Sequence, residues 1–410
     1  MRVHTVRAEC RTSTPRTNFS RMTQPSTIEV DRPDIESPSA NDREAETRLA
    51  AWFRDLGSVL IGFSGGVDSA YLACVAVDAL GAERVLAVIG RSASYPAEQW
   101  ERAREVARSF AIPVLEVNTD EVSDPRYAAN PSNRCYFCKT ELWDQLAPIA
   151  RDRGLAVVVD GTNADDLGDH RPGARAAAEH AVRSPLAELG FSKAMIRRLS
   201  RARGIRTWSQ PASPCLSSRI PYGTAVTIDR LRQVERAERA LRDAGVSGDL
   251  RVRYHGDLAR IEIAADALDE WLAPSARDVL RNAVLSAGFG RVALDVRGFR
   301  SGSLNVLGGV VAEPLVRARS GISAGDADGL TRELRGRGLA CHVEGRERLG
   351  VLTWSERGPR DPLAEVRTRA VVIEAARGYG FTHVAVDLAT DVAARVVDGP
   401  AAPDATVRRG

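Results

Sequence analysis

A short run of small and acidic residues is the part of the chain whose chemistry is easiest to name. It consists of Ser64, Gly65, Gly66, Val67, Asp68 and Ser69. An apolar run typical of a β-strand, 59–63, precedes it, and an apolar run typical of a buried helix, 70–77, follows it. A glycine-rich turn between such elements directs backbone N–H groups and the positive end of a helix at one point, where phosphate binds.

A Walker loop would need a Lys after its last Gly, and this run has none. The run therefore predicts a nucleotide-phosphate loop of another kind. Asp68 is its natural magnesium ligand, because hard cations prefer carboxylate oxygens. Capping of the following helix is the alternative role of this side chain.

Three cysteines could do a second kind of chemistry. Cys135 and Cys138 form a C-x-x-C pair, whose spacing lets two thiolates reach one metal centre, and Cys215 follows later in the chain. The three together would hold a 4Fe-4S cluster with one open iron, which can carry an extra sulfide. A redox pair, a zinc site and independent thiols are the alternatives. The six His residues form no H-x₃₋₅-H pair, which weakens the zinc alternative.

Polar residues near these motifs could bind a nucleotide or a substrate anion. Asn163 and Asp165 belong to the loop 161–166, which leaves a predicted strand and could serve the nucleotide, magnesium or the substrate. Arg219 follows Cys215 by four residues. It could lower the pKa of that thiol or hold a substrate anion.

Two further pairs of basic residues stand out. Arg251 and Arg253 alternate along a predicted strand, so both point to one face and suit a phosphate or carboxylate clamp. An exposed strand face would show the same pattern. Lys139 and Lys193 are the only lysines in a chain rich in Arg. They mark positions at which an ammonium group serves better than a guanidinium.

Strands alternate with helices along the region that carries these residues. Predicted strands cover 59–63, 85–89, 114–117 and 155–160, and predicted helices cover 44–56, 70–77, 97–110 and 142–152. The alternation predicts an α/β fold, with a doubly wound parallel sheet that binds its ligand at the carboxyl ends of the strands.

The expected organisation adds smaller units to this domain. We expect a disordered tail at 1–43, the nucleotide-binding domain at 44–222, a smaller α+β domain at 223–305, a degenerate repeat of it at 306–400 and a tail at 401–410. The repeat is visible because the segment 287–296 recurs as 379–388.

The second copy lacks the proposed clamp. Alignment of the copies places Ala340 and His342 where the first copy has Arg251 and Arg253. We therefore expect the repeat to serve packing or assembly, in place of a subunit contact made by a shorter relative.

Composition is typical of a cytoplasmic enzyme. The chain has 410 residues, 44% of them hydrophobic, which is ample for real cores, and a net charge of +3, too mild to demand nucleic acid. No apolar run approaches the length of a membrane span, and the first 40 residues contain no signal-peptide core. Six cysteines in so long a chain do not suggest a disulfide framework. Three of them are expected to be inert: Cys10, Cys74 and Cys341.

The SGGVDS run is the signature of the PP-loop ATP pyrophosphatases, and the chain resembles that superfamily. The stretches NPSNRCYFCK, DGTNADD, HRPGARAA, SPLAELGFSK and PCLSSRIPYG narrow the resemblance. Together with SGGVDS they closely resemble the LarE family of ATP-dependent sulfur transferases, in order over residues 47–305.

The LarE resemblance implies a substrate, pyridinium-3,5-biscarboxylic acid mononucleotide, on the route to the nickel-pincer cofactor of lactate racemase. ATP and Mg²⁺ would convert its carboxylates to acyl-adenylates, and sulfur would displace AMP to give thiocarboxylates. In one branch the sulfur comes from the enzyme's own cysteine, at the position of Cys215. In another, three cysteines hold a 4Fe-4S cluster that passes on a sulfide. This chain has all three cysteines and resembles the cluster branch.

The resemblance also implies roles for individual residues. Cys215, Asp68, Arg219 and Glu238 would take part in the reaction. Residues near the substrate would be Ser218, Arg219, Arg251, Arg253, Lys139 and Lys193.

Two other functions compete with sulfur transfer to this mononucleotide. One is a tRNA thiolase, which also combines a PP-loop with three cluster cysteines. The other is a non-enzymatic nucleotide-binding scaffold. No segment resembles an RNA-binding module, so we expect a small-molecule substrate and no nucleic acid. We also expect no membrane association and a homo-oligomer.

Overall fold

The computed structural model describes residues 36–168, 172–211, 213–300, 302–304, 323–355 and 361–389. Outside these ranges lie the predicted tail at 401–410, residues 1–35 of the predicted tail at 1–43, and parts of the predicted repeat at 306–400. The first helix, α1 (Ala40–Leu56), begins four residues before the predicted start at Glu44. Ser39 and Asp42 explain the earlier start because they form a capping box, with N–H···O distances of 3.1 and 2.9 Å.

A four-stranded parallel sheet forms the first part of the fold, as the alternation of strands and helices predicts. Its strands are β1 (Val59–Gly62), β2 (Val85–Arg91), β3 (Val114–Asn118) and β4 (Val157–Val159). The order β3-β2-β1-β4 brings all four carboxyl ends to one edge of the sheet. The α/β fold class is therefore confirmed.

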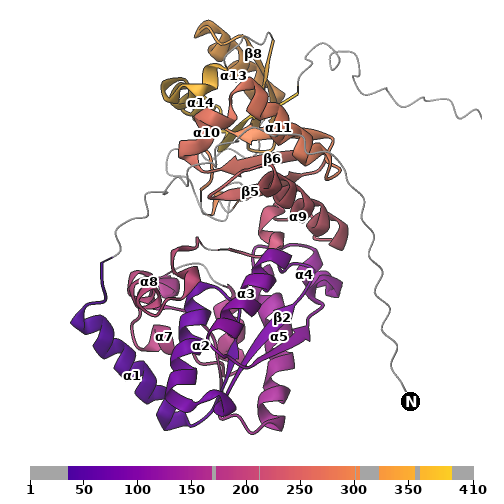
Figure 1. Cartoon of the computed structure of the whole chain (residues 1–410). Helices are drawn as coiled ribbons and strands as arrows, with labels where there is room; N and C mark the ends of the chain where they lie inside the picture. Colours follow the sequence, from indigo (N-terminus) through magenta and orange to yellow (C-terminus); the bar gives the residue numbers. More distant parts are fainter. Residues whose placement is uncertain are drawn as a thin grey trace, which may run out of the picture. The chain divides into compact units, whose positions relative to one another are not determined.

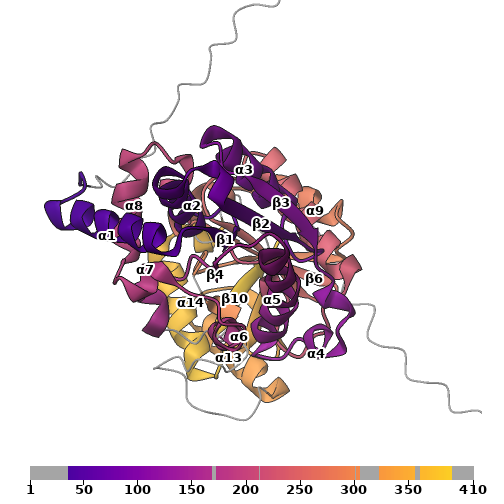
Figure 2. The same ribbon diagram turned by 90° about the horizontal axis from the view of Figure 1, so that it is seen from below.

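Helices cover both faces of this sheet. On one side lie α1, α2 (Val67–Leu80), α3 (Ala97–Ser109) and α8 (Lys193–Ala202), and on the other lie α5 (Arg134–Asp152) and α6 (Pro172–Glu179). Figure 2 looks along these layers, with the sheet between the two groups. Residues alternate along β1, so Val59 and Ile61 pack against the first group while Leu60 packs against α5 and α6. Short helices α4 (Pro125–Ala128) and α7 (Pro185–Glu188) connect the larger ones.

A mixed six-stranded sheet forms the second part of the fold (Figure 1). Its strands are β5 (Leu250–His255), β6 (Leu258–Ile263), β7 (Arg291–Asp295), β8 (Cys341–Arg346), β9 (Leu349–Trp354) and β10 (His383–Asp387). Their order is β5-β6-β7-β10-β9-β8. The accompanying helices are α9 (Ile228–Asp243), α10 (Leu268–Trp271), α11 (Pro274–Leu285), α13 (Ala324–Gly336) and α14 (Val366–Gly378).

One face of this second sheet is apolar and packs against the helices. Val252, Ile261, Leu294, Leu352 and Val386 join side chains of α9, α11, α13 and α14 in a single buried core. None of the described helices is long and apolar enough to cross a membrane.

Candidate functional site

The SGGVDS run lies at the carboxyl end of β1, where α2 begins at Val67 with Gly66 as its N-cap. Gly65 adopts a φ of 68°, which side chains other than glycine rarely adopt. A Cβ atom on Gly65 would also lie 2.4 Å from the Cβ of Ala103 in α3. Only glycine fits this position, and its absence of a side chain lets the loop pack directly on α3.

Two serines shape the loop around the start of the helix. The Ser69 hydroxyl lies 3.2 Å from the Ser64 hydroxyl and donates to the carbonyl of Gly66 at 3.2 Å. The N–H groups of the first turn, from Val67 on, point out of the helix, because a first turn has no acceptor within its own helix. The loop therefore presents N–H donors and the positive helix end to one point, which is the geometry of a phosphate site.

Asp68 joins two other predicted residues beside this loop. Its carboxylate forms an ion pair with the Lys193 ammonium and accepts a hydrogen bond of 3.4 Å from the Asn163 amide. Asp165 adjoins them, because its carboxylate accepts from the backbone N–H of Lys193 at 2.8 Å. The structure thus brings together residues from three separate segments, and Asp68 faces the two other segments rather than capping its own helix.

Glycine also explains the close approach of the loop after β4. A Cβ atom on Gly161 would lie 2.9 Å from the backbone nitrogen of Ser69. This approach carries Asn163 and Asp165 to the phosphate loop.

The cysteine motif lies on a helix. The sequence predicts a helix only from residue 142, but α5 begins at Arg134, so Cys135 and Cys138 lie one turn apart in its first two turns. Cys215 precedes the short 3₁₀ turn η5 (Leu216–Arg219).

The three thiols share one neighbourhood. Burial raises the pKa of Cys138 well above its ordinary value, and the charges of Glu121, Cys215 and Cys135 add to this rise. The pKa of Arg134 is raised although burial acts to lower it, because Cys215 and Cys135 stabilise its charge. Among the described residues, no group of three His, Cys, Asp or Glu side chains is arranged to hold a metal ion. The cluster stays a prediction.

Residues before the C-x-x-C motif bind directly to the segment of Cys215. Asn130, in the left-handed region at φ 55°, donates from its side chain to the carbonyls of Ile220 and Pro221 at 3.2 and 2.7 Å. Tyr127 and Ser217 share a hydroxyl–hydroxyl hydrogen bond of 2.6 Å. These bonds bridge about ninety residues of chain, and they fix the loop of Cys215 against α4 and the start of α5.

Arg219 holds the loop of Cys215 from the other side. Its guanidinium donates two hydrogen bonds of 3.0 Å to the carboxylate of Glu238 and one of 3.1 Å to the carbonyl of Cys215. Burial alone would raise the pKa of Glu238, but Arg219 and the N–H of Val252 hold it below its ordinary value. Arg219 is 2% exposed, so its geometry is that of a residue that positions the cysteine.

Arg251 and Arg253 are buried, which removes the alternative of an exposed strand face. Arg253 donates to Glu262 at 2.7 Å and to the carbonyl of Ser218 at 3.0 Å. Burial lowers the pKa of Arg251 to about 10, and the positive charges of Arg219 and Arg253 contribute. Buried positive charge is therefore concentrated next to the loop of Cys215.

Lys139 lies elsewhere on α5. Its ammonium stacks on the ring of Trp143 at 4.8 Å from the centroid, and its stem lies close to Gly173 in α6.

Several polar residues at these sites were not predicted from the sequence. Tyr95 and Gln99 both donate to the carbonyl of Ser64, at 2.8 and 3.2 Å. Glu121 is buried beside Cys138 and accepts from the Ser94 hydroxyl at 2.5 Å. A polar side chain that becomes buried needs a hydrogen-bond partner, so polar residues close to predicted strand ends are the signal that could have identified these three.

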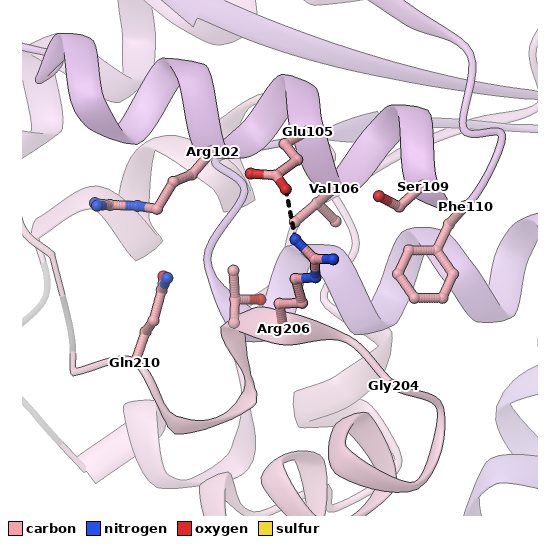
Figure 3. A pocket seen from close by; sticks show the side chains of 9 residues that line it. Arg102, Glu105, Val106, Ser109, Phe110, Gly204, Arg206 and Gln210 are labelled. Carbon is pink, nitrogen blue, oxygen red and sulfur yellow. Dashed lines mark hydrogen bonds and ion pairs between the residues drawn. The ribbon is translucent and has the colours of Figure 1, made fainter. Parts of the chain in front are cut away.

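A surface cavity of about 370 Å³ lies apart from these residues, between α3 and the 3₁₀ turn η4 (Arg206–Ser209). Figure 3 shows Arg206 directed at Glu105 across it, with Arg102 and Gln210 at its rim. None of the predicted site residues lines this cavity. It is therefore not the candidate site.

The different environments of the cysteines predict different reactivity. Burial raises the pKa of Cys74 to about 12 and that of Cys341 to about 11, whereas Cys135 is exposed. Because the thiolate is the reactive form, iodoacetamide at pH 8 should modify Cys135 in metal-free protein about 100-fold faster than Cys138, Cys74 or Cys341. Peptide mass mapping over time measures these rates, and equal rates for Cys135 and Cys138 would contradict the raised pKa of Cys138.

Comparisons with known proteins agree with this geometry. A family model described as NAD synthase matches residues 53–132, the phosphate loop and the strands around it. An uncharacterised protein of Synechocystis is 44% identical over 257 residues, which are 63% of this chain and 95% of that protein. An ammonia-dependent NAD⁺ synthetase of Methanococcoides burtonii is 39% identical over 72 residues, 18% of this chain and 27% of that protein.

Another relative, whose name states a reaction, also aligns over 257 residues. The pyridinium-3,5-bisthiocarboxylic acid mononucleotide synthase of Lactiplantibacillus plantarum is 37% identical over 257 residues, 63% of this chain and 92% of its own length. At that identity and coverage, this chain belongs to the LarE family of PP-loop proteins, the family of that synthase.

Proposed function

We propose that the protein is an ATP-dependent sulfur transferase that converts the carboxylates of pyridinium-3,5-biscarboxylic acid mononucleotide to thiocarboxylates for nickel-pincer cofactor synthesis. The observation that carries the proposal is the similarity to the Lactiplantibacillus plantarum synthase along nearly its whole length, with the phosphate loop and the Cys215 loop both present. This similarity favours sulfur transfer to the mononucleotide over the two alternatives, a tRNA thiolase and a non-enzymatic nucleotide-binding scaffold. A cytoplasmic location agrees with six cysteines in so long a chain, which do not suggest a disulfide framework.

Activation of the carboxylate is the first step. A carboxylate is a poor electrophile, so its oxygen attacks the α-phosphorus of ATP and pyrophosphate leaves, which gives an acyl-adenylate. The N–H groups at the start of α2 stabilise the charge on the phosphates. Asp68, Asn163 and Asp165 would hold Mg²⁺. Their oxygen donors suit this ion, which takes one or two carboxylates and completes its shell with phosphates and water.

Substrate anions would bind at the buried arginines. Arg251 and Arg253 lie beside Ser218 and the loop of Cys215, and burial, together with the charges of Arg219 and Arg253, lowers the pKa of Arg251. A phosphate or carboxylate bound there would stabilise the charged form of these guanidinium groups. Lys193 would leave Asp68 for a phosphate oxygen once ATP binds, and Lys139 would serve the substrate from α5.

Sulfur transfer is the second step. A sulfur nucleophile attacks the acyl carbon and AMP leaves with the electron pair of the broken bond. If Cys215 is the nucleophile, a thioester forms first. Loss of the Cα proton and cleavage of the Cβ–S bond then release the thiocarboxylate and leave dehydroalanine. Arg219 and Glu238 would hold the Cys215 loop in place through both events.

The three cysteines allow another sulfur source. Thiolates are the ligands that iron–sulfur clusters take, and Cys135, Cys138 and Cys215 lie within electrostatic reach of one another. A bound 4Fe-4S cluster would supply a sulfide from its open iron. Anaerobically purified protein should then contain close to four iron atoms per chain, and replacing any of the three cysteines by Ala should remove the iron and the brown colour. Iron-free wild type would contradict this source.

The proposed reaction has a direct test. Incubation of anaerobic protein with ATP, Mg²⁺ and the mononucleotide should release pyrophosphate and AMP in proportion to product, and mass spectrometry should show oxygen replaced by sulfur. Release of pyrophosphate without a sulfur-containing product would contradict the proposal. Mass loss equal to H₂S at Cys215 after one turnover would identify the cysteine as the source.

A further inference from the structure

The six-stranded sheet consists of two halves with the same connectivity. In the first half, α9 precedes the antiparallel hairpin β5–β6, and α11 precedes β7, which lies parallel to β6. In the second half, α13 precedes the antiparallel hairpin β8–β9, and α14 precedes β10, which lies parallel to β9. We call α9 to β7 the first copy and α13 to β10 the second copy.

The hairpin turns fix the correspondence between the copies. Gly256 and Glu347 both open a two-residue turn with positive φ, 71° and 50°. These turns equate Arg253 with Glu344 and His255 with Arg346. The correspondence is displaced by two residues from the sequence alignment, which placed His342 at the position of Arg253. The second copy lacks the arginines under either correspondence.

A local twofold relates the copies. Strand β7 pairs antiparallel with β10, so that Asp295 lies opposite Ala385, Leu294 opposite Val386 and Ala293 opposite Asp387. The parallel pairings equate 293–295 with 385–387. Leu294 and Val386 are equivalent and lie opposite each other, so the twofold axis passes between them. Asp295 lies opposite Ala385, the equivalent of Ala293, as a twofold requires. This is the pattern of an isologous contact between two subunits, here formed within one chain.

Charged contacts across the axis join unlike residues. Arg291 donates to Glu344 at 2.7 Å and to Asp387 at 2.9 Å. Arg346 donates to Asp257, at the tip of the β5–β6 hairpin, at 2.7 Å. The second copy thus supplies carboxylates to Arg291 of the first copy. Its Arg346 also holds the β5–β6 hairpin, which carries Arg251 and Arg253 of the first copy.

Two first copies could not reproduce these contacts. If the β7 strands of two molecules paired about the same axis, Arg291 of one would face Arg253 of the other, the equivalent of Glu344. Like charges in contact disfavour an association, and such contacts are one way in which proteins exclude wrong partners. At the hairpin tip, His255 would stand where Arg346 now pairs with Asp257.

We propose that the second copy is a built-in partner that occupies the twofold face of the first copy, and that Glu344 and Arg346 select this pairing within the chain over pairing between two molecules. Two of the residues by which the second copy departs from the first, Glu344 and Arg346, contact the first copy across the axis. The occupant of the β7 edge is therefore residues 323–355 and 361–389 of the same chain.

The test replaces these charges in the full chain. Glu344→Arg with Arg346→His gives the second copy the residues of the first. The melting midpoint should fall by roughly 5 °C relative to wild type. Light scattering should show a mass that rises with concentration beyond that of wild type, because pairing within the chain would then carry the same repulsion as pairing between two molecules. The matched control is Glu333→Arg with Arg337→His, which makes the same changes in an ion pair at the end of α13 that does not join the two copies.

The comparison between these two double variants decides the proposal. Equal midpoints and equal masses for the two would overturn it. Should the first variant fail to fold, Glu344→Gln removes the attraction without adding repulsion. It should lower the midpoint by a smaller amount, and no fall relative to Glu333→Gln would also overturn the proposal.

Discussion

Replacing Asp68 by Asn should lower ATP-dependent pyrophosphate release by about 10²–10³-fold, the usual effect of removing one group that stabilises charge in a transition state. The change keeps the shape of the side chain but removes the charge that faces Lys193 and would hold Mg²⁺. Release of pyrophosphate is measured with the mononucleotide, ATP and Mg²⁺, and circular dichroism checks that α2 is retained.

The matched control for Asp68 lies on the same helix. Asp78→Asn removes an equal charge from α2, but Asp78 is 63% exposed and pairs with Arg203 away from the phosphate loop. Its activity should remain close to that of wild type. Similar activities for the two variants would show that Asp68 does not serve ATP.

Replacing Cys215 by Ala should abolish thiocarboxylate formation, a loss of more than about 10³-fold, because either sulfur source requires this thiol. Adenylylation does not need the thiol, so pyrophosphate release in the first turnover should persist. The test follows pyrophosphate and the sulfur-containing product in the same reaction, and it thereby separates the two steps.

Other cysteine variants identify the source of sulfur. If Cys215 gives up its own sulfur, Cys135→Ala should still complete one turnover. If the three thiols hold a cluster, Cys135→Ala should lose both iron and product. Cys341→Ala, in β8 and far in sequence from the motif, is the control, and it should retain product formation. Full product formation by Cys215→Ala would contradict the proposed chemistry.

The parallel sheet and its phosphate loop were predictable because their signals are local. Short apolar runs, the Gly-rich turn and the alternation with helices each lie within a few residues, and the structure follows them closely. Element ends were less predictable. The polar residues around Cys135 resemble a loop, but α5 already begins at Arg134, directly after the turn at Asn130.

Contacts between distant segments were beyond the reach of sequence patterns. Nothing near Tyr127 indicates that its hydroxyl meets Ser217, ninety residues later. The correspondence of the two copies failed for a different reason. Alignment matched Gly256 with Gly345, since glycine is the usual residue at positive φ, whereas the turn of the second copy uses Glu347 at φ 50°.

The two glycine contacts of the phosphate loop have a thermodynamic consequence. Gly65 rests against Ala103 of α3, and Gly161 rests against the backbone of Ser69, so packing already determines the loop conformation. A loop that is ordered before its ligand arrives loses little conformational entropy on binding, and fixing one residue otherwise costs about 1–2 kcal/mol. Gly65→Ala should therefore weaken ATP binding more than the loss of any single hydrogen bond, because it forces the whole loop away from α3.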